Sequence, residues 1–435
     1  MNQFGVGNAI GGLLCDSSKG LWRGNQLVDG STVGFELKDY CDPLLEQNVI
    51  QGQAISVVCR HDCRGIFHDN VVKDSHTGFK LLGRTTSLLT QNFVHQCQLA
   101  LAASDDSRAE IRCNTLQSNG KGLLVSGAAR IIFDQNTVTD NFEEGVTIGG
   151  SSQSELKDNI ICFNDHNIRI TGGNPILCGN TIESSRSSYG VECTGGSGTL
   201  LKNRIQHNEL AQVRIDLDAA PNIQNNLVAF GRSAGILVTG RSAAFISKND
   251  LLSNDGSGLI VSEKAAPIIV ANCCQDCGKN GLEFTQQARG VVLRNTIVRS
   301  MAESVLISGE AAPVLDANII QHSLHDGILV MHRSRPTLRR NHVTSCKQVG
   351  INVRDEARPT VNSNFVLQGK SHGLSLDGEA RGYYSNNTFS QNEKVGIMVI
   401  GSAAPTCSFN LVELAGVREC LAVKVLKHGT DMILT

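Results

Sequence analysis

Aromatic side chains are scarce in this sequence: they make up 4% of its 435 residues, with one Trp and four Tyr. Large aromatic-lined pockets, and the stacking platforms on which carbohydrate-binding sites rely, are therefore hard to build. Proline is also rare, with eight residues, and no apolar run reaches the ~18 residues of a membrane-spanning helix. We therefore expect no membrane-spanning segment, and a carbohydrate-binding module is disfavoured.

A charge bias is also missing, because 39 Lys and Arg residues nearly balance 41 Asp and Glu residues. The net charge of -2 provides no electrostatic attraction toward phosphate backbones or anionic membranes, so we expect neither nucleic acid nor a membrane as partner.

Residues 1–12 lack the basic start and the continuous apolar core of a secretory signal. The odd number of Cys residues, fifteen, favours reduced, buried thiols and hence a cytoplasmic protein.

What the sequence does contain is a ladder of asparagines. Eighteen Asn residues follow one another at steps of 21 to 23 residues: Asn25, Asn48, Asn70, Asn92, Asn114, Asn136, Asn159, Asn180, Asn203, Asn226, Asn249, Asn272, Asn295, Asn318, Asn341, Asn364, Asn387 and Asn410. The residue three positions before each of them is apolar in every repeat, from Trp22 to Cys407, which indicates an inward-facing column. A recurrent Asn at a turn can satisfy backbone groups and bond to its equivalents above and below, so we expect this ladder to be structural.

Short runs of alternating residues lie between successive Asn residues, as in 235–238, 258–261, 327–330 and 396–399. Period two indicates strands, and a unit of 22–23 residues with three turns leaves no room for a helix. The sequence therefore predicts an all-β fold, a right-handed single-stranded parallel β-helix, or solenoid, of about 18 coils. We expect the solenoid to span 1–410 and a closing segment to span 411–435.

The repeat between Asn249 and Asn272, with its Gly-led strand at 258–261 and its Pro267, resembles the parallel β-helix repeats shared by pectate lyases, C5-epimerases and CASH-type domains. Its regularity and short turns are most similar to the non-catalytic repeats of F-box-only and nessun dorma type proteins. That resemblance implies partner recognition rather than catalysis. The expected function is a protein-protein interaction scaffold without enzymatic activity, within a larger assembly such as a cytoskeletal or ciliary structure.

The alternative function is a polysaccharide-acting β-helix enzyme: a lyase, a hydrolase or a C5-epimerase. Five charged residues are expected on one outer face, in neighbouring coils: Arg169, Glu192, Arg214, Asp216 and Asp218. Two carboxylates and an Arg could bind an acidic sugar, hold Ca²⁺ or abstract a proton, or they could form a ladder of ion pairs between strands. The resemblance implies that catalysis would also need a cleft walled by long turns, and the short repeat steps rule such turns out.

A stripe of apolar residues is predicted on the outer face of the same strands. It consists of Leu237, Ile260, Leu306, Leu329 and Met398. Stacked exposed apolar residues mark a contact surface, so these five are the predicted partner-binding residues. The other explanation is that residues 411–435 fold over the stripe.

Two Cys and His groups have the short spacing of metal ligands: Cys59, His61, Cys63 and His68 in one, and Cys273, Cys274 and Cys277 in the other. The repeat pattern places Cys59 and Cys274 at inward-facing positions and Cys277 in a second polar column, five residues after the ladder Asn. We therefore expect no metal and no cofactor.

A column of arginines stands six residues before the ladder Asn: Arg64, Arg108, Arg130, Arg289, Arg335, Arg358 and Arg381. Two residues earlier, acids recur at Asp62, Asp106, Glu310, Glu356 and Glu379. The arginines either hold a charged partner or, as we favour, pair with these acids along a solvated edge.

Overall fold

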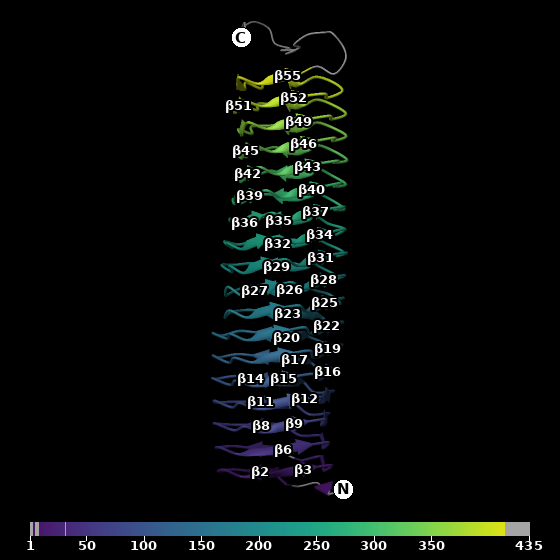
Figure 1. The fold of residues 1–435 in the computed structure, drawn as a ribbon, viewed down its shortest axis with the longest axis vertical. Coiled ribbons are helices and arrows are strands. Elements are labelled where there is room, and N and C mark those ends of the chain that lie inside the picture. The colour runs from purple at the N-terminus through teal and green to yellow at the C-terminus, as the bar shows by residue number, and fades with distance from the viewer. Residues whose placement is uncertain (1–2, 5–7, 31, 414–435) are drawn as a thin grey trace. The chain divides into compact units, whose positions relative to one another are not determined.

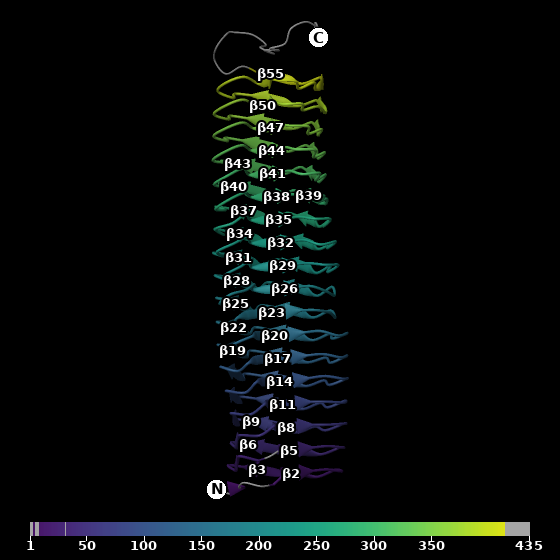
Figure 2. The same ribbon diagram turned by 180° about the vertical axis from the view of Figure 1, so that it is seen from behind.

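The computed structural model of the protein describes residues 3–4, 8–30 and 32–413 and contains, within those ranges, short strands and no helix. Accordingly, none of the described residues forms a helix long and apolar enough to cross a bilayer. The predicted parallel β-solenoid of about eighteen coils is confirmed (Figures 1 and 2). The chain divides into two units, 1–227 and 228–435, and each is described by itself.

Each coil contributes one strand to each of three parallel sheets. In the second unit a representative coil consists of β35 (Leu259–Val261) in sheet 1, β36 (Ile268–Val270) in sheet 2 and β37 (Cys273–Gln275) in sheet 3. The connection from sheet 2 to sheet 3 is the two-residue Asn turn, and the longest described connection in the chain, 184–190, joins β25 (Thr181–Glu183) to β26 (Val191–Cys193). No described turn is long enough to wall a deep cleft.

The apolar columns predicted from the repeat form the core. The parallel register aligns Ile246, Ile269, Val292 and Leu315 in successive coils of sheet 2, and all four are completely buried. In sheet 1 the alternation of inward and outward residues places Leu259 and Val261 in the core and Ile260 on the outside. Because each coil only contacts its neighbours, the core is a stack of similar layers.

The asparagine ladder has the structural role that was predicted. The Asn295 Oδ1 accepts hydrogen bonds from the backbone N–H of Asn272 at 2.8 Å and from Asn272 Nδ2 at 3.0 Å. The Asn272 Nδ2 also donates to the Ile246 carbonyl at 2.9 Å. The preceding turn residue, Ala271, has a φ of 53°, a left-handed conformation that tightens the chain reversal. Each Asn therefore links three consecutive coils.

The last described strand is β55 (Leu411–Glu413), which pairs with β52 (Thr388–Ser390) in sheet 3. The closing segment that we expected over 411–435 lies, from 414 on, outside the described residues.

Candidate functional site

The charged residues of the first unit lie on the outer face of sheet 1. Five strands form this part of the sheet: β17 (Lys121–Val125), β20 (Glu144–Ile148), β23 (His166–Ile170), β26 and β29 (Val213–Ile215). The register aligns Thr147, Arg169, Glu192 and Arg214 in one outward column. The structure thus brings Arg169, Glu192, Arg214 and Asp216 together, and places Asp218 on the exposed turn after β29.

These residues form a chain of alternating charges, which we call the ion-pair ladder: Lys121, Glu144, Arg169, Glu192, Arg214 and Asp216. Glu192 lies between two guanidinium groups, with Oε2 at 3.3 Å from Arg169 Nε and Oε1 at 3.2 Å from Arg214 Nη1. Arg169 also approaches Glu144 at 3.5 Å, and Lys121 Nζ lies 3.0 Å from a Glu144 oxygen.

The charges of the ion-pair ladder stabilise one another. Burial raises the pKa of Glu144, but the hydrogen bond and charge of Lys121 outweigh it, so the pKa is lowered overall. The hydrogen bond that Lys121 donates to Glu144 is also the main cause of the raised pKa of Lys121. Each Glu192 oxygen contacts a guanidinium, so the carboxylate is held in ion pairs on both sides. This geometry matches an ion-pair ladder between strands better than a catalytic pair.

Sequence reasoning missed two residues beside the ion-pair ladder, Tyr189 and His166. The Arg214 Nη1 donates to the Tyr189 hydroxyl at 3.0 Å, and the Arg214 guanidinium lies 5.1 Å from the centre of the Tyr189 ring. His166 is 9% exposed, with Nδ1 at 3.0 Å from the Ser188 hydroxyl and Nε2 at 3.1 Å from the Ile168 carbonyl. The spacing of the asparagines does not mark Tyr189, because the step from Asn180 to Asn203 is the ordinary 23 residues.

The buried His166 predicts a pH-dependent stability. Burial lowers its pKa below 6.5, against the opposing charge of Glu192. Below pH 6.5 the unfolded chain binds a proton at this histidine more readily than the folded chain does. The free energy of unfolding therefore decreases as the pH is lowered. We expect urea midpoints measured from pH 7.5 to 5.5 to fall more steeply for the natural protein than for His166→Gln. Equal slopes would contradict this role of His166.

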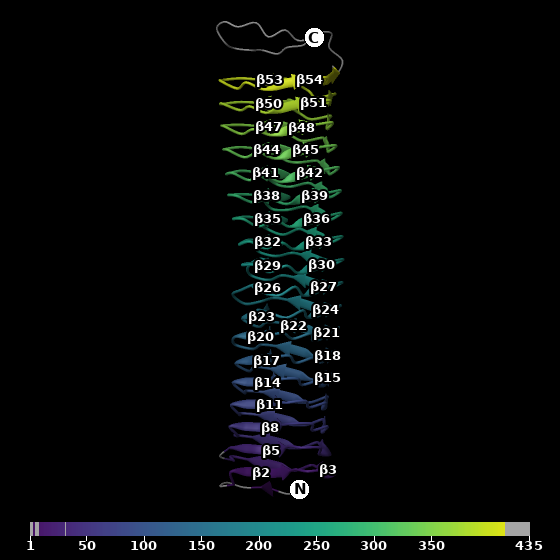
Figure 3. The same ribbon diagram turned by 90° about the vertical axis from the view of Figure 1, so that its left-hand side faces the viewer.

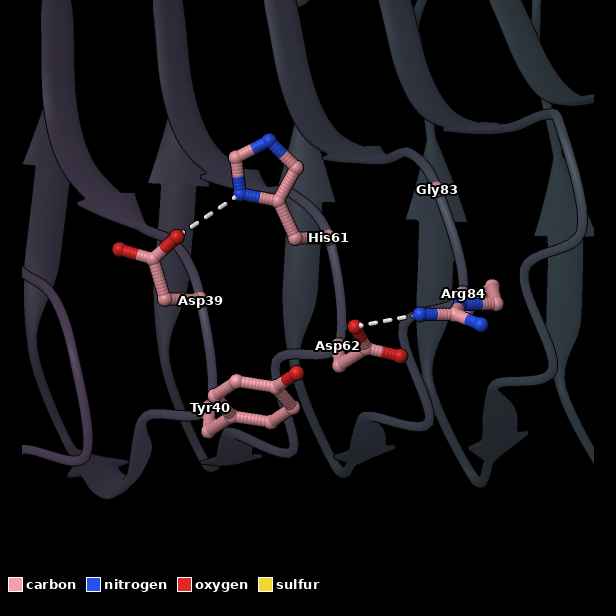
Figure 4. Close-up of a pocket in the computed structure, with 6 residues that line it drawn as sticks. All are labelled: Asp39, Tyr40, His61, Asp62, Gly83 and Arg84. Atoms are coloured by element: carbon pink, nitrogen blue, oxygen red, sulfur yellow. Dashed lines mark hydrogen bonds and ion pairs between the residues drawn. The ribbon is translucent and has the colours of Figure 1, made fainter.

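An open cavity of about 360 Å³ lies at the turns that follow sheet 1 in the same unit (Figure 4). It is lined by Asp39, Tyr40, His61, Asp62, Gly83 and Arg84. The His61 Nδ1 lies 3.1 Å from Asp39 Oδ1, and the Arg84 Nη2 donates to Asp62 Oδ2 at 3.0 Å. Because the His61 and Arg84 side chains are 62% and 71% exposed, water screens both ion pairs and they contribute little stability.

Among the described residues, neither of the two groups with metal-ligand spacing brings all of its members together. Cys59 and Cys63 are completely buried, whereas His61 lies in the open cavity. Cys274 and Cys277 are also buried, and burial raises the pKa of Cys277 to about 12, which keeps it a thiol. Among the described residues, no group of three or more His, Cys, Asp or Glu side chains is placed to hold a metal ion.

The predicted apolar stripe lies on the outer face of sheet 1 in the second unit. The register places Leu237 beside Ile260 and Leu306 beside Leu329, with Glu283 between the two pairs. Met398 follows farther along, after Asn352 and Ser375. Leu329 is only 8% exposed and the other four are half-buried, since strands ~4.8 Å apart shield short side chains from both sides.

A more exposed apolar surface, missed by sequence reasoning, lies on the outer face of sheet 2 in the second unit. It spans β33 (Phe245–Ser247), β36, β39 (Val291–Leu293) and β42 (Val314–Asp316), stacked one above the next in Figure 3. We call it the apolar patch: Phe245, Ile268, Val270, Val291, Leu293 and Val314. The exposed fractions of Phe245, Ile268 and Val291 are 38%, 47% and 40%. The available signal was a second apolar column, four residues before the ladder Asn.

Two members of the arginine column, Arg289 and Arg335, border this patch. The pairing that we favoured between the arginines and the preceding acids is wrong, because Asp62 pairs with Arg84 and Glu356 pairs with Arg333. In the part of the chain that the structure describes, the seven column arginines are exposed and make no ion pair.

Comparison with known proteins gives a family and a fold. The sequence model of the family described as "Right handed beta helix region" matches 166–312 and 285–413, which together cover more than half of the chain. A second model, described as "Periplasmic copper-binding protein (NosD)", matches 61–220. The residues present do not fit a copper ion, because the described part of the chain holds no group of three or more His, Cys, Asp or Glu side chains placed to bind a metal. No curated protein matches the sequence.

Solved structures resemble the chain at low identity. The periplasmic alginate epimerase AlgG is 12% identical over 82% of this chain and 77% of its own, with a TM-score of 0.37. The Dettilon tailspike protein is 11% identical over 72% and 62%, with a TM-score of 0.41. The AlgE6 A-module, a mannuronan C-5 epimerase from Azotobacter vinelandii, is 11% identical over 91% of both chains, with a TM-score of 0.27. With TM-scores below 0.5, these likenesses carry no argument about this chain.

Proposed function

The chain belongs to the right-handed beta helix family, and from that premise we propose that it is a non-enzymatic protein-protein interaction scaffold that binds its partner through the apolar patch. The observation that carries this proposal is the run of exposed Phe245, Ile268 and Val291 across successive coils. Contiguous exposed apolar residues on a soluble surface usually mark a contact site. The half-buried stripe on sheet 1, predicted first, is a weaker candidate for the same role.

The short turns also favour a scaffold. A flat sheet face without deep walls suits a protein surface better than a substrate that must be enclosed. The repeat resembles the non-catalytic repeats of F-box-only and nessun dorma type proteins, which supports protein recognition.

We further propose a cytoplasmic setting, within a cytoskeletal or ciliary assembly, because the fourteen described Cys residues are free thiols.

The test is proximity labelling in cells with the full chain. The double variant Phe245→Ser plus Ile268→Ser is expected to lose a defined set of labelled proteins, at least about tenfold in yield. The matched control is Ile132→Ser, because Ile132 occupies the same column at 36% exposure but lies between Glu110 and Glu155. An unchanged set of labelled proteins in the double variant, or an equal loss in the control, would count against the scaffold.

A second candidate function is action on an acidic polysaccharide at the ion-pair ladder. It is favoured by the cluster of Arg214, Tyr189 and His166, which combines a cation, a hydroxyl and a neutral imidazole beside the outer face of sheet 1. Incubation with alginate would detect this activity. Depolymerisation or epimerisation that Tyr189→Phe abolishes would establish the enzyme. Unchanged alginate would count against the enzyme and favour the scaffold.

A further inference from the structure

We propose that the partner segment bound by the apolar patch is an amphipathic α-helix whose apolar stripe is flanked by Asp and Glu. This inference rests on the proposed function and names the chemistry of its partner.

The patch has the dimensions of a helix-binding surface. It crosses four coils, and successive coils of a parallel sheet are ~4.8 Å apart. An α-helix advances ~5.4 Å per turn, so a helix lying across the strands presents one turn to each coil. Phe245, Ile268, Val291 and Val314 form one line along that direction, with Val270 and Leu293 beside it. Residues spaced i, i+3, i+4 and i+7 on a helix could cover both lines.

Basic residues border the patch on both sides. Arg289 stands before β39, and Lys248 and Arg294 follow β33 and β39 on the other side. Arg335, Arg339 and Arg340 continue both edges on the next strand, β45 (Thr337–Arg339), which pairs with β42. The two sides are five residues apart along the strand, roughly 16 Å, which accommodates the ~10 Å width of a helix. These positions form two positive edges around an apolar centre.

The edges retain positive charge that the chain does not neutralise. In the described ranges, Lys248, Arg289, Arg294 and Arg335 are exposed and make no ion pair. On the edge that carries Lys248 and Arg294, Asp316 is 3% exposed and is already bound by Arg339 and Arg340. The Nε atoms of these arginines lie 3.0 and 2.7 Å from the Asp316 oxygens. Two guanidinium groups on one carboxylate leave a net positive charge there. An acidic partner is therefore electrostatically complementary.

An anionic lipid surface would offer the same charge, but the shape of the patch favours a helix. Membrane-binding side chains project from a surface to reach the acyl region. Phe245, Ile268 and Val291 instead lie on strands of a flat sheet and are more than half covered by their neighbours.

The experiment measures binding of two fluorescent peptides to the full chain by anisotropy. Both have about 18 residues, roughly 27 Å as a helix, with a Leu stripe, and one carries Glu and the other Lys on the flanks. We expect the Glu peptide to bind and the Lys peptide to bind at least about tenfold more weakly. Binding of the Glu peptide should weaken at least about tenfold in Arg289→Glu plus Arg294→Glu, and as NaCl is raised.

The matched control is Arg108→Glu plus Arg130→Glu, which reverses two unpaired arginines of the same column in the first unit and should leave binding unchanged. Equal binding of the two peptides would overturn the inference, as would binding only to vesicles that contain phosphatidylserine. Such results would leave the scaffold standing if Phe245→Ser plus Ile268→Ser still loses its labelled proteins. If that variant loses none, the scaffold itself fails.

Discussion

Replacing Asn295 by Leu is expected to lower the free energy of unfolding by about 3–5 kcal/mol. Asn295 is 1% exposed, and its Oδ1 accepts two hydrogen bonds from Asn272. Its Nδ2 donates to the Ile269 carbonyl at 2.9 Å and to the Asn318 Oδ1 at 3.0 Å. Leu has a similar volume, so the loss comes from unsatisfied buried polar groups rather than from a cavity.

Urea unfolding followed by circular dichroism measures this loss. The control is Thr296→Val, the next residue along the chain, which lies on the outer face of sheet 3 and is half-buried. We expect the control to stay within about 0.5 kcal/mol of the natural protein. A loss below about 1 kcal/mol for Asn295→Leu would mean that the asparagine ladder does not hold the coils together.

Replacing Glu192 by Leu is expected to lower the free energy of unfolding by about 1–3 kcal/mol, because it leaves Arg169 and Arg214 side by side without their shared carboxylate. The Glu192 side chain is 9% exposed, but the Arg169 side chain is 44% exposed, and solvent screening reduces the cost. Adding Arg214→Leu to Glu192→Leu should recover part of the loss, since it removes one of the stranded charges.

The same urea measurement separates a structural from a catalytic role for Glu192. A structural ion-pair ladder predicts a clear loss of stability in Glu192→Leu and a partial recovery in the double variant. Unchanged or increased stability in Glu192→Leu would mean that Glu192 is held in place for chemistry, and would favour the polysaccharide enzyme.

The fold could be predicted from sequence because its determinants are local and repeated. Each ladder Asn marks one coil, and the apolar residue three positions earlier marks one inward position. The same pattern recurs in eighteen repeats, so each repeat independently predicts the same local structure. Ile260 could be placed outside the core from the alternation of its strand alone.

The surface was harder to predict because it depends on contacts between coils. Arg64 and Asp62 are close in sequence, yet Asp62 pairs with Arg84 in the next coil. Leu329 points outward as expected but is 8% exposed, whereas Ile268, at a position not singled out, is 47% exposed. A period-two pattern gives the face on which a residue lies, and the side chains above and below decide how much of it water reaches.

The most direct measurement of the central claim is site-specific photo-crosslinking in cells. A photoreactive amino acid replaces Ile268 in one variant and Ile132 in another, since the two residues occupy equivalent columns of sheet 2 in different units. The scaffold predicts an adduct with a discrete protein at position 268 and none at position 132. No adduct at 268, or the same adducts at both positions, would contradict it.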